Sequence, residues 1–347
     1  MRMRTRFRRL TIAAAILASL GLAACGSGTH STGPVHGSWD DVVAAANKEG
    51  HVLLYSSQKP ANLQALKASF EAKYPKISME FVRGTDADIN PRVETENRIN
   101  KGVADVHMVT DAAWIKTASD SGAYSTELVG PSLESPAYEP EKSVINNRFF
   151  LTSAAVFALG WNVKGVPKGL VSPRDILKPE YTGKIGIVNP AGIASYVDLY
   201  RYYSKNFGED YWDKLAALKP RVFPSAIAIG QALASGEVVV APAVQPLVAE
   251  IAAGAPVGWT LPENPWGTPW YSHVLKVAPH PNAAQVLADF MVTREGQTAL
   301  NNGYAATLPD IPGAVARAQD IKSPDPADLT PERIKEYTRQ WEKLFLS

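Results

Sequence analysis

The sequence predicts an α/β protein with two lobes. A strand–helix–strand pattern between residues 51 and 82 is the βαβ unit of a parallel sheet, and similar units follow through residue 241. An apolar, β-prone run at residues 151–162 is long for one strand of a small sheet. We therefore expect this run to leave one lobe and to enter the other.

The elements follow from hydrophobic spacing and from helix caps. Ser38 is placed to cap a first helix that carries Trp39, Val42 and Ala46. The elements expected next are a strand at 51–55, a helix from 63 that Pro75 ends, a strand at 77–82, a charged helix at 91–101, strands at 103–109 and 184–188, helices at 193–203 and 228–234, and a strand at 237–241.

The two lobes require two crossovers. We expect the first near Ala158 and the return within residues 259–271, which divides the chain into 38–158 (lobe 1), 159–262 (lobe 2) and 263–347 (lobe 1). Prolines interrupt the return segment, which predicts neither a regular helix nor a central strand there. A helix from Pro331 with Trp341 on its apolar face should pack on lobe 1. Two crossovers place a ligand cleft between the lobes.

The first residues have the pattern of an export signal. Five arginines between positions 2 and 9 precede an apolar stretch at 10–22 that is too short to cross a bilayer. The motif LAACG then ends near Cys25, the only cysteine of the chain, and resembles the lipobox of bacterial lipoproteins. We expect a signal peptide at 1–24, a lipid on Cys25, a flexible tether at 25–37 and an extracytoplasmic location.

Charge and cysteine content exclude several classes of protein. The chain has 35 basic and 34 acidic residues, and loss of the leader arginines would leave the folded part net acidic, which argues against nucleic-acid binding. With one cysteine there is no disulfide framework, and the six histidines lack metal-ligand spacing. We therefore expect no cofactor, no metal site and no catalytic residues.

Several motifs in order resemble the solute-binding proteins of bacterial ABC importers, in the iron(III)-type branch of extracellular solute-binding protein family 1. They include VLLYSSQ at 52–58, GVADVHMVTDAAW at 102–114, FALGWNVKGVP at 157–167 and GQALASGEVVVAPA at 230–243. The resemblance implies a periplasmic-binding-protein-like fold of type II, monomeric and lipid-anchored. It also implies closure on a small solute and delivery to an ABC permease with its ATPase subunits.

The ferric ligands of that branch are not matched here. Iron-binding members carry a histidine after the first strand, an acidic residue after the third and a tyrosine pair after the later GE strand. The corresponding positions here are Lys59, Thr110 beside Asp111, and Pro246 with Leu247. Lysine cannot ligate iron while charged, and proline and leucine offer no side-chain donor. Ferric iron or an iron chelate is therefore the alternative solute.

The candidate solute site combines polar loops that follow strands. Ser57 and Gln58 are expected to open the first long helix, and residues 189–196 open a helix in the other lobe, so both helix N-termini would favour an anion. Two roles are open for Asp111: it caps the helix that follows it, or it binds an amine group of the solute. The complete candidate set is Ser57, Gln58, Thr110, Asp111, Ser195, Tyr196, Gln245 and Tyr271.

These residues predict a receptor for a small polar solute. The expected solute is an organic or inorganic anion such as a phosphonate, phosphate or carboxylate, with or without an amine. A surface-anchored hydrolase is a third hypothesis, but the sequence has neither G-x-S-x-G nor H-E-x-x-H.

Overall fold

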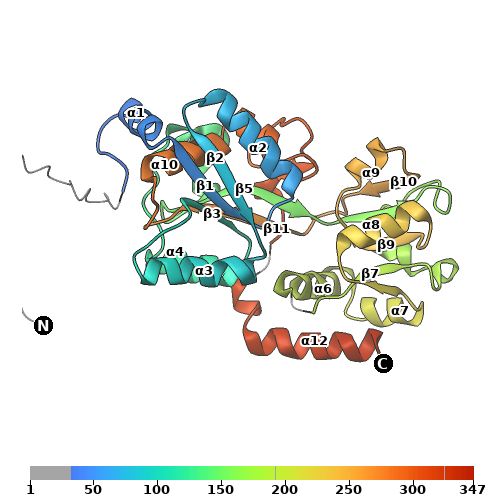
Figure 1. The fold of residues 1–347 in the computed structure, drawn as a ribbon. Coiled ribbons are helices and arrows are strands. Elements are labelled where there is room, and N and C mark those ends of the chain that lie inside the picture. The colour runs from blue at the N-terminus through green and yellow to red at the C-terminus, as the bar shows by residue number, and fades with distance from the viewer. Residues whose placement is uncertain (1–32, 192, 324) are drawn as a thin grey trace, which may run out of the picture. The chain divides into compact units, whose positions relative to one another are not determined.

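Three sheets organise the fold (Figure 1). The computed structural model describes residues 33–191, 193–323 and 325–347. The large sheet has the order β13-β12-β5-β11-β3-β1-β2, with β4 paired to β5; the small sheets have the orders β10-β6-β9 and β7-β8. The strands are β1 (His51–Ser56), β2 (Ser78–Arg83), β3 (Val106–Val109), β4 (Val144–Ile145), β5 (Phe149–Val156), β6 (Ala158–Asn162), β7 (Gly186–Val188), β8 (Arg221–Phe223), β9 (Val240–Val244), β10 (Val257–Thr260), β11 (Gly267–Val274), β12 (Ala305–Ala306) and β13 (Ala316–Arg317).

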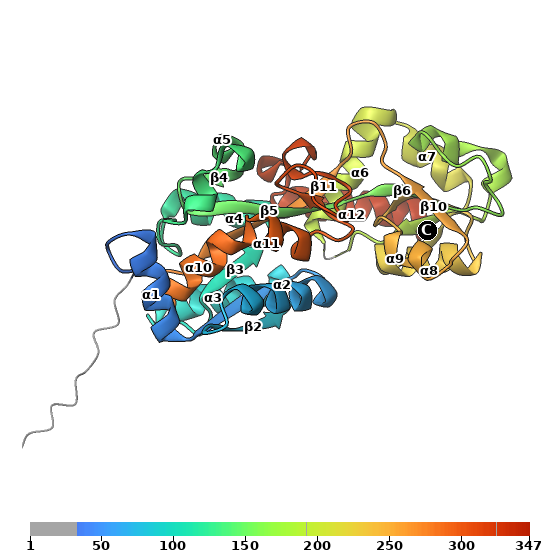
Figure 2. The ribbon, with the colours of Figure 1, turned by 90° about the horizontal axis from the view of Figure 1, so that it is seen from above.

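Helices cover the sheets, as the second view shows (Figure 2). They are α1 (Trp39–Glu49), α2 (Pro60–Lys73), α3 (Asp86–Arg98), α4 (Ala112–Ser121), α5 (Pro140–Ser143), α6 (Ala194–Phe207), α7 (Tyr211–Ala217), α8 (Ala226–Ser235), α9 (Val248–Ala252), α10 (Pro281–Met291), α11 (Arg294–Leu300) and α12 (Pro331–Phe345). The predicted α/β fold class is confirmed.

Alternation along β1 divides the core of the large sheet into two faces. Val52 and Leu54 pack in one cluster with residues of α1, α2 and α10, whereas Tyr55 packs with Ile89 and Val93 of α3. A strand with a period of two presents successive side chains to opposite faces. Helices on both faces therefore bury β1, as expected for a parallel strand.

The long apolar run at 151–162 forms two strands that belong to different sheets. β5 ends at Val156 in the large sheet and β6 begins at Ala158 in a small one, so the chain crosses at Phe157. The chain returns between β10 and β11. We call the elements around the large sheet the large-sheet lobe and those around the two small sheets the small-sheet lobe. The two crossovers follow the expected path, and the exact domain boundaries stay a prediction.

The return segment contains a central strand, which corrects the prediction that prolines exclude one. β11 lies between β5 and β3 and includes Pro269. It pairs with β5 from Gly267 onward, but with β3 only from Tyr271 to Val274. Pro269 therefore lies in the part of the strand that has a neighbour on one side only, where a missing N–H is tolerated.

Two other boundaries differ from the sequence-based expectation. α3 begins at Asp86 and contains Pro91, because Thr85 and Asp88 form a capping box one turn ahead of that proline. β9 begins at Val240, three residues later than expected. The predicted helix cap at Ser38 is confirmed by a capping box with Asp41.

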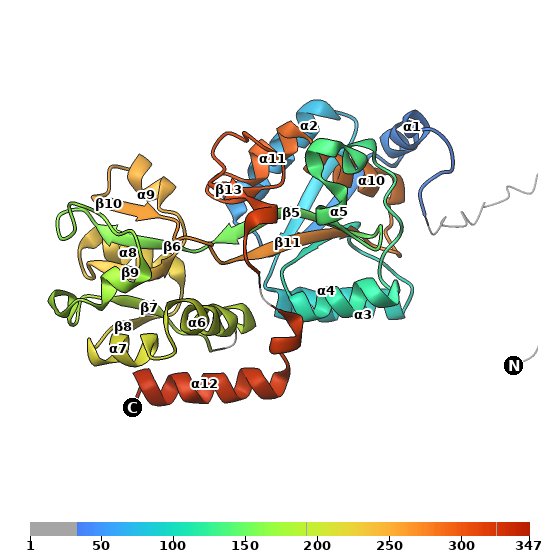
Figure 3. The same cartoon turned by 180° about the vertical axis from the view of Figure 1, so that it is seen from behind.

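The C-terminal helix packs on the small-sheet lobe, so its predicted place on lobe 1 is wrong (Figure 3). The rings of Trp341 and Tyr200 of α6 lie 5.9 Å apart, and those of Phe345 and Trp212 of α7 lie 6.3 Å apart. The hydrophobic spacing of α12 identified its apolar face correctly. This spacing could not show that the apolar face of α12 packs against aromatic residues of α6 and α7.

The predicted signal peptide, Cys25 and most of the tether lie outside the described residues. The last part of the expected tether is attached to the fold, because the Val35 N–H donates to Asn282 Oδ1 at 2.9 Å. Within the described part of the chain, no helix has the length and apolar character needed to cross a membrane.

Two histidines face each other inside the large sheet. His107 of β3 and His273 of β11 are opposite in register, with Nδ1 of the first 3.1 Å from Nε2 of the second. The other ring nitrogen of His273 lies 2.8 Å from Ser125 Oγ. Both rings are fully buried, and burial lowers the pKa of His107 to about 3 and that of His273 well below its usual value.

We expect His107 and His273 to stay neutral at pH 5, where an ordinary histidine is mostly protonated. Since the unfolded chain binds these protons first, stability that depends on the neutral rings is full above about pH 6.5 and falls as the pH drops toward 3. NMR titration of the imidazole carbons should show no shift for these two rings between pH 7.5 and 5. Midpoints near 6.5 for both rings would contradict this.

Candidate functional site

Polar side chains gather at the carboxyl edge of the large sheet. β1 is paired in parallel with both β2 and β3. The loops that follow these three strands therefore emerge at one edge, where open α/β sheets bind ligands. They carry Ser57 to Lys59, Arg83 to Asp86, and Thr110 with Asp111.

Ser57 joins an aromatic and cationic group. The Trp270 Nε1–H donates to Ser57 Oγ at 3.0 Å, and the Trp270 ring lies 5.0 Å from that of Tyr304. Lys59 Nζ lies 4.8 Å from the centroid of the Tyr304 ring, within cation–π range. Burial raises the pKa of Tyr304, and the charge of Arg83 opposes this rise. Lys59 therefore contacts the Tyr304 ring, and the charge of Arg83 acts on the same phenol.

Gln58 is fully buried, and neither side-chain amide atom has a hydrogen-bond partner among the described residues. Its backbone carbonyl accepts a bond from Arg83 Nε at 3.0 Å. Buried polar atoms are almost always paired, and an unpaired one costs free energy. The Gln58 amide therefore has unused hydrogen-bonding capacity beside the candidate site.

Lys59 is the N-cap residue of α2, and no side chain caps this helix. The expectation that Ser57 and Gln58 open the helix is thus corrected: they precede the cap, and Pro60 is the first helical residue. Burial lowers the pKa of Lys59, and the negative charge of Glu250 in α9 opposes this effect. Because α9 belongs to the small-sheet lobe, charges from both lobes influence Lys59.

Thr110 binds a buried carboxylate. Its backbone N–H and its hydroxyl donate to Asp86 Oδ2 at 2.9 and 2.5 Å. Asp86 Oδ1 is also buried and has no described partner. Burial raises the pKa of Asp86, hydrogen bonds from Thr110 and Ser57 oppose the rise, and the nearby charge of Asp111 adds to it.

Asp111 itself caps a helix. Its Oδ1 accepts from the N–H groups of Ala113 and Trp114 at 3.1 and 3.0 Å, and the residue is exposed. The capping alternative accounts for this carboxylate. Asp86 is therefore the carboxylate that lies with Ser57 and Thr110.

The small-sheet lobe contributes the start of α6. The N-cap Ile193 makes no side-chain capping bond, so the backbone of Ala194 and Ser195 begins the helix without a side-chain acceptor. The Tyr196 ring contacts Phe157 edge-on at 5.5 Å, and burial raises its pKa. The Tyr196 phenol also raises the pKa of Tyr304, so tyrosines from the two lobes lie within electrostatic range of each other.

The last two predicted residues have different surroundings. Gln245 follows β9, and its Oε1 is buried without a described partner, as in Gln58. Tyr271 packs with Leu151 and with Phe149, in clusters that do not contain Trp270. Among the described contacts, Trp270 rather than Tyr271 joins the group around Ser57.

Sequence reasoning missed Arg83, Asp86 and Tyr304 as site residues. Arg83 and Asp86 belong to a polar turn directly after a predicted strand, a signal as strong as the one that selected Ser57. Tyr304 had no such signal, because it reaches the site from a loop after α11.

A separate pocket of about 440 Å³ lies between α6, α7 and α12. Its wall includes the aromatic residues Tyr200, Trp212 and Trp341 together with charged residues such as Arg201 and Asp213. None of the eight predicted site residues lines it. Its position depends on α12, so sequence analysis that placed α12 on the other lobe could not anticipate it.

Comparisons with known proteins identify the family and the fold. A family model described as bacterial extracellular solute-binding protein matches residues 52–304. Comparison with curated protein sequences gave no significant match.

Solved structures show the fold. Iron-bound HitA from Pseudomonas aeruginosa is 21% identical with a TM-score of 0.65, and the match covers 85% of this chain and 99% of that one. A substrate-binding protein of an ABC transporter from Agrobacterium tumefaciens is 16% identical with a TM-score of 0.68, covering 87% and 97%. The periplasmic binding protein AfuA from Actinobacillus pleuropneumoniae, with fructose-6-phosphate bound, is 20% identical with a TM-score of 0.61, covering 86% and 99%.

The unpaired amide of Gln58 predicts a stability gain on its removal. Gln58→Met keeps the shape but deletes both unpaired atoms, so the free energy of unfolding should rise by about 1 kcal/mol. Gln285→Met is the matched control, because Gln285 is equally buried but bonds to Glu127 O at 2.7 Å and to Val129 N at 3.2 Å. The control should lose about 1–3 kcal/mol. Equal losses for both variants in urea unfolding would contradict the account.

Proposed function

Because the chain belongs to the bacterial extracellular solute-binding proteins, we propose that it captures a small anionic solute between its two lobes for an ABC importer. The family binds solutes and is not a class of enzymes, so the hydrolase hypothesis is set aside. The observation that carries the proposal is the cation of Lys59, whose Nζ lies 4.8 Å from the centroid of the Tyr304 ring at the carboxyl edge of the sheet, with Arg83 at the end of the neighbouring strand β2.

Partial burial makes Lys59 a suitable anion contact. The lowered pKa of Lys59 means that its charge is poorly solvated in the free protein. An anion placed against it would offset that cost, and Arg83 would add a second charge-assisted hydrogen bond. The Gln58 amide N–H groups supply neutral donors at the same edge.

The opposite side of the solute would meet the start of α6. Backbone N–H groups at a helix N-terminus, together with the helix dipole, favour an anion, and Ser195 adds a hydroxyl. Tyr196 and Gln245 supply further polar atoms from the small-sheet lobe. A solute drives closure only if it contacts both lobes, since it must favour the closed state. Hinge closure of this kind is known for periplasmic binding proteins as a class.

Asp86 extends the proposal to solutes that also carry an amine. Its Oδ1 is buried and has no described partner, and an ammonium group placed there would favour the ionised carboxylate. The candidate solutes are therefore phosphates, phosphonates and carboxylates, with amine-bearing forms among them. Thr110 and Ser57 would hold Asp86 in place.

Ferric iron is less consistent with this group of residues. Tyr196 and Tyr304 are the phenol donors near the site, but burial raises the pKa of both and so disfavours the tyrosinate form. The adjacent Lys59 would also repel a ferric ion while charged. We therefore propose the anion, with iron or an iron chelate as the alternative outcome of the test.

The hinge would lie at the two crossovers, Phe157 and the segment between β10 and β11. We propose the division 38–158, 159–262 and 263–347, with α12 reassigned to the small-sheet lobe because of its packing. Delivery to a permease with its ATPase subunits, a monomeric state and attachment through Cys25 complete the proposal.

Thermal-shift and calorimetric screening should find stabilisation by at least one anion among phosphate, phosphonates, sugar phosphates and carboxylates. Lys59→Gln and Arg83→Gln should each weaken its binding by about 10-fold or more, because each removes a charge-assisted contact. Lys116→Gln, on exposed α4 and paired only with Asp120, is the matched control and should not change affinity.

Three results would contradict the anion assignment. They are stabilisation by none of these anions, equal affinity of the Lys59→Gln variant and the control, and stabilisation by ferric salts alone with a visible tyrosinate–iron band. The last would support the iron alternative.

Attachment through Cys25 is tested by localisation. The full chain should fractionate with membranes and incorporate labelled palmitate, and Cys25→Ser should abolish both, since the thiol is the proposed acceptor. Palmitate labelling that persists in Cys25→Ser would contradict the proposal.

A further inference from the structure

Two imidazoles and a carboxylate meet at the edge of the large sheet opposite the candidate solute site. His51 is the first residue of β1, Asp105 directly precedes β3, and His280 is the N-cap residue of α10. One ligand atom from each lies within 4.8 Å of the others. Ser57 follows the far end of β1, so a six-residue strand, about 20 Å long, separates the two places.

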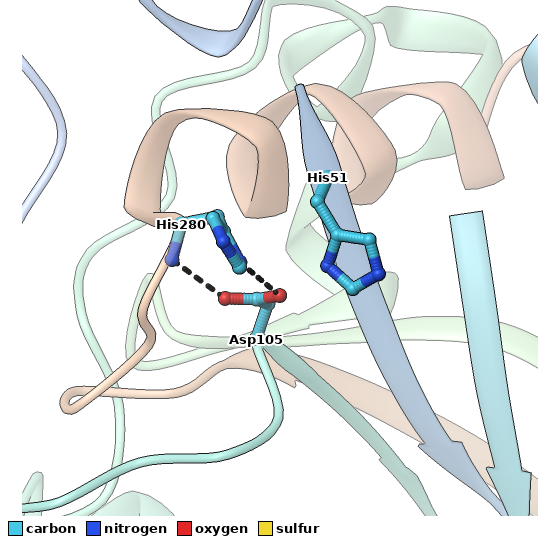
Figure 4. A group of neighbouring side chains, drawn as sticks. All are labelled: His51, Asp105 and His280. Carbon is cyan, nitrogen blue, oxygen red and sulfur yellow. Dashed lines mark hydrogen bonds and ion pairs between the residues drawn. The ribbon is translucent and has the colours of Figure 1, made fainter. Parts of the chain in front are cut away.

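Asp105 and His280 form a fixed pair (Figure 4). Asp105 is fully buried, and its Oδ1 accepts from the His280 backbone N–H at 2.7 Å while its Oδ2 lies 3.0 Å from His280 Nδ1. Oδ2 also accepts from the Leu53 N–H at 2.8 Å. These bonds hold the carboxylate and the imidazole in one orientation before any ligand binds.

The position of His280 at the N-cap of α10 does not explain why the His51 ring lies beside the Asp105–His280 pair. The His51 and His280 rings lie 5.1 Å apart, and Figure 4 shows the His51 ring beside the Asp105 carboxylate. Nε2 of His51 lies 3.8 Å from Glu80 Oε2, which is beyond hydrogen-bond distance. The His51 side chain is partly exposed, and besides the ring contact with His280 it has only this long contact with Glu80, so it can rotate toward its neighbours.

Charge around the cluster favours a cation. Glu80 lies beside His51, and Glu49 lies near His280, where it accepts from the Asn282 and Ala283 N–H groups at 3.2 and 2.7 Å. Glu49 is thereby committed to the start of α10. Glu80, with its side chain 68% exposed, can approach a bound cation from solvent.

We propose that His51, Asp105 and His280 bind one divalent transition metal ion of the Zn²⁺ class. Imidazole and carboxylate ligands with one open position suit Zn²⁺. With bonds of about 2.0–2.1 Å, tetrahedral ligands lie about 3.3 Å apart, close to the 3.0 Å between His280 Nδ1 and Asp105 Oδ2. The metal ion takes the place of the proton between His280 Nδ1 and Asp105 Oδ2. The widest separation between two ligand atoms, up to 4.8 Å, must shorten by about 1.5 Å, and rotation of the His51 side chain supplies this change.

All three ligands belong to the large-sheet lobe, so the ion ties β1, the approach to β3 and α10 together without bridging the lobes. Metal binding here is distinct from solute capture. The inference therefore does not depend on the proposed function. In a metal titration, binding that is lost when His51 is changed is assigned to this site.

The test uses the full chain with His30→Ala and His36→Ala, which removes the N-terminal histidines from competition. After treatment with a chelator, calorimetric titration with ZnCl₂ should show one saturable equivalent, and CoCl₂ should give the visible bands of tetrahedral Co²⁺. His51→Gln and His280→Gln should each weaken Zn²⁺ binding by at least about 10-fold, the minimum loss typical even for outer partners of metal ligands.

Lys116→Gln, at an exposed position of α4 and paired with Asp120, is the matched control and should bind Zn²⁺ like the parent. His51→Gln is the decisive variant, because a half-buried side chain with one long ion pair is dispensable for folding, which circular dichroism can verify. No saturable Zn²⁺ binding by the parent, or unchanged affinity in folded His51→Gln, would overturn the proposal.

Discussion

The parallel pairing of β1 with β2 and with β3 determines where the chemistry of this protein lies. Parallel register sends the carboxyl end of each strand to the same edge, so Lys59, Arg83 and Thr110 converge although they are far apart in sequence. The same pairing brings the amino ends together at the opposite edge, where His51 and Asp105 meet His280. One constraint thus separates the candidate solute site from the proposed metal site by the length of a strand.

The crossovers give the carboxyl edge a second wall. β5 and β6 are separated only by Phe157, which makes this residue one end of the proposed hinge between the large sheet and the small ones. Phe157 also contacts Tyr196 and Trp266, so the hinge residue packs directly against the start of α6. In the proposed mechanism, closure and solute contact are therefore coupled through the same aromatic group.

Local patterns in the sequence predicted most of the fold. Ser38, the HVLLY strand and the divided run at 151–162 were identified because caps, periodicity and strand length are local properties. Two errors had non-local causes. The strand containing Pro269 is allowed only because β3 stops short of it, and α12 lies on the lobe whose aromatic residues match its own.

The candidate site was predicted in part for the same reason. Ser57, Gln58 and Thr110 follow strands, so their edge could be inferred, whereas the helix-capping bonds of Asp111 and the packing of Tyr271 needed the structure. Tyr304 comes from a distant loop and could not be found from strand ends. The histidine cluster had no sequence signal at all, since its three ligands are separated by more than fifty residues at each step.

The central claim is that one solute contacts both lobes at the carboxyl edge. Backbone hydrogen exchange with and without the tightest-binding anion tests it most directly, because exchange reports protection at each segment separately. The account predicts slower exchange both at residues 57–59 and at residues 194–197 when the anion is bound. Protection confined to one lobe, or found only around α12, would contradict it.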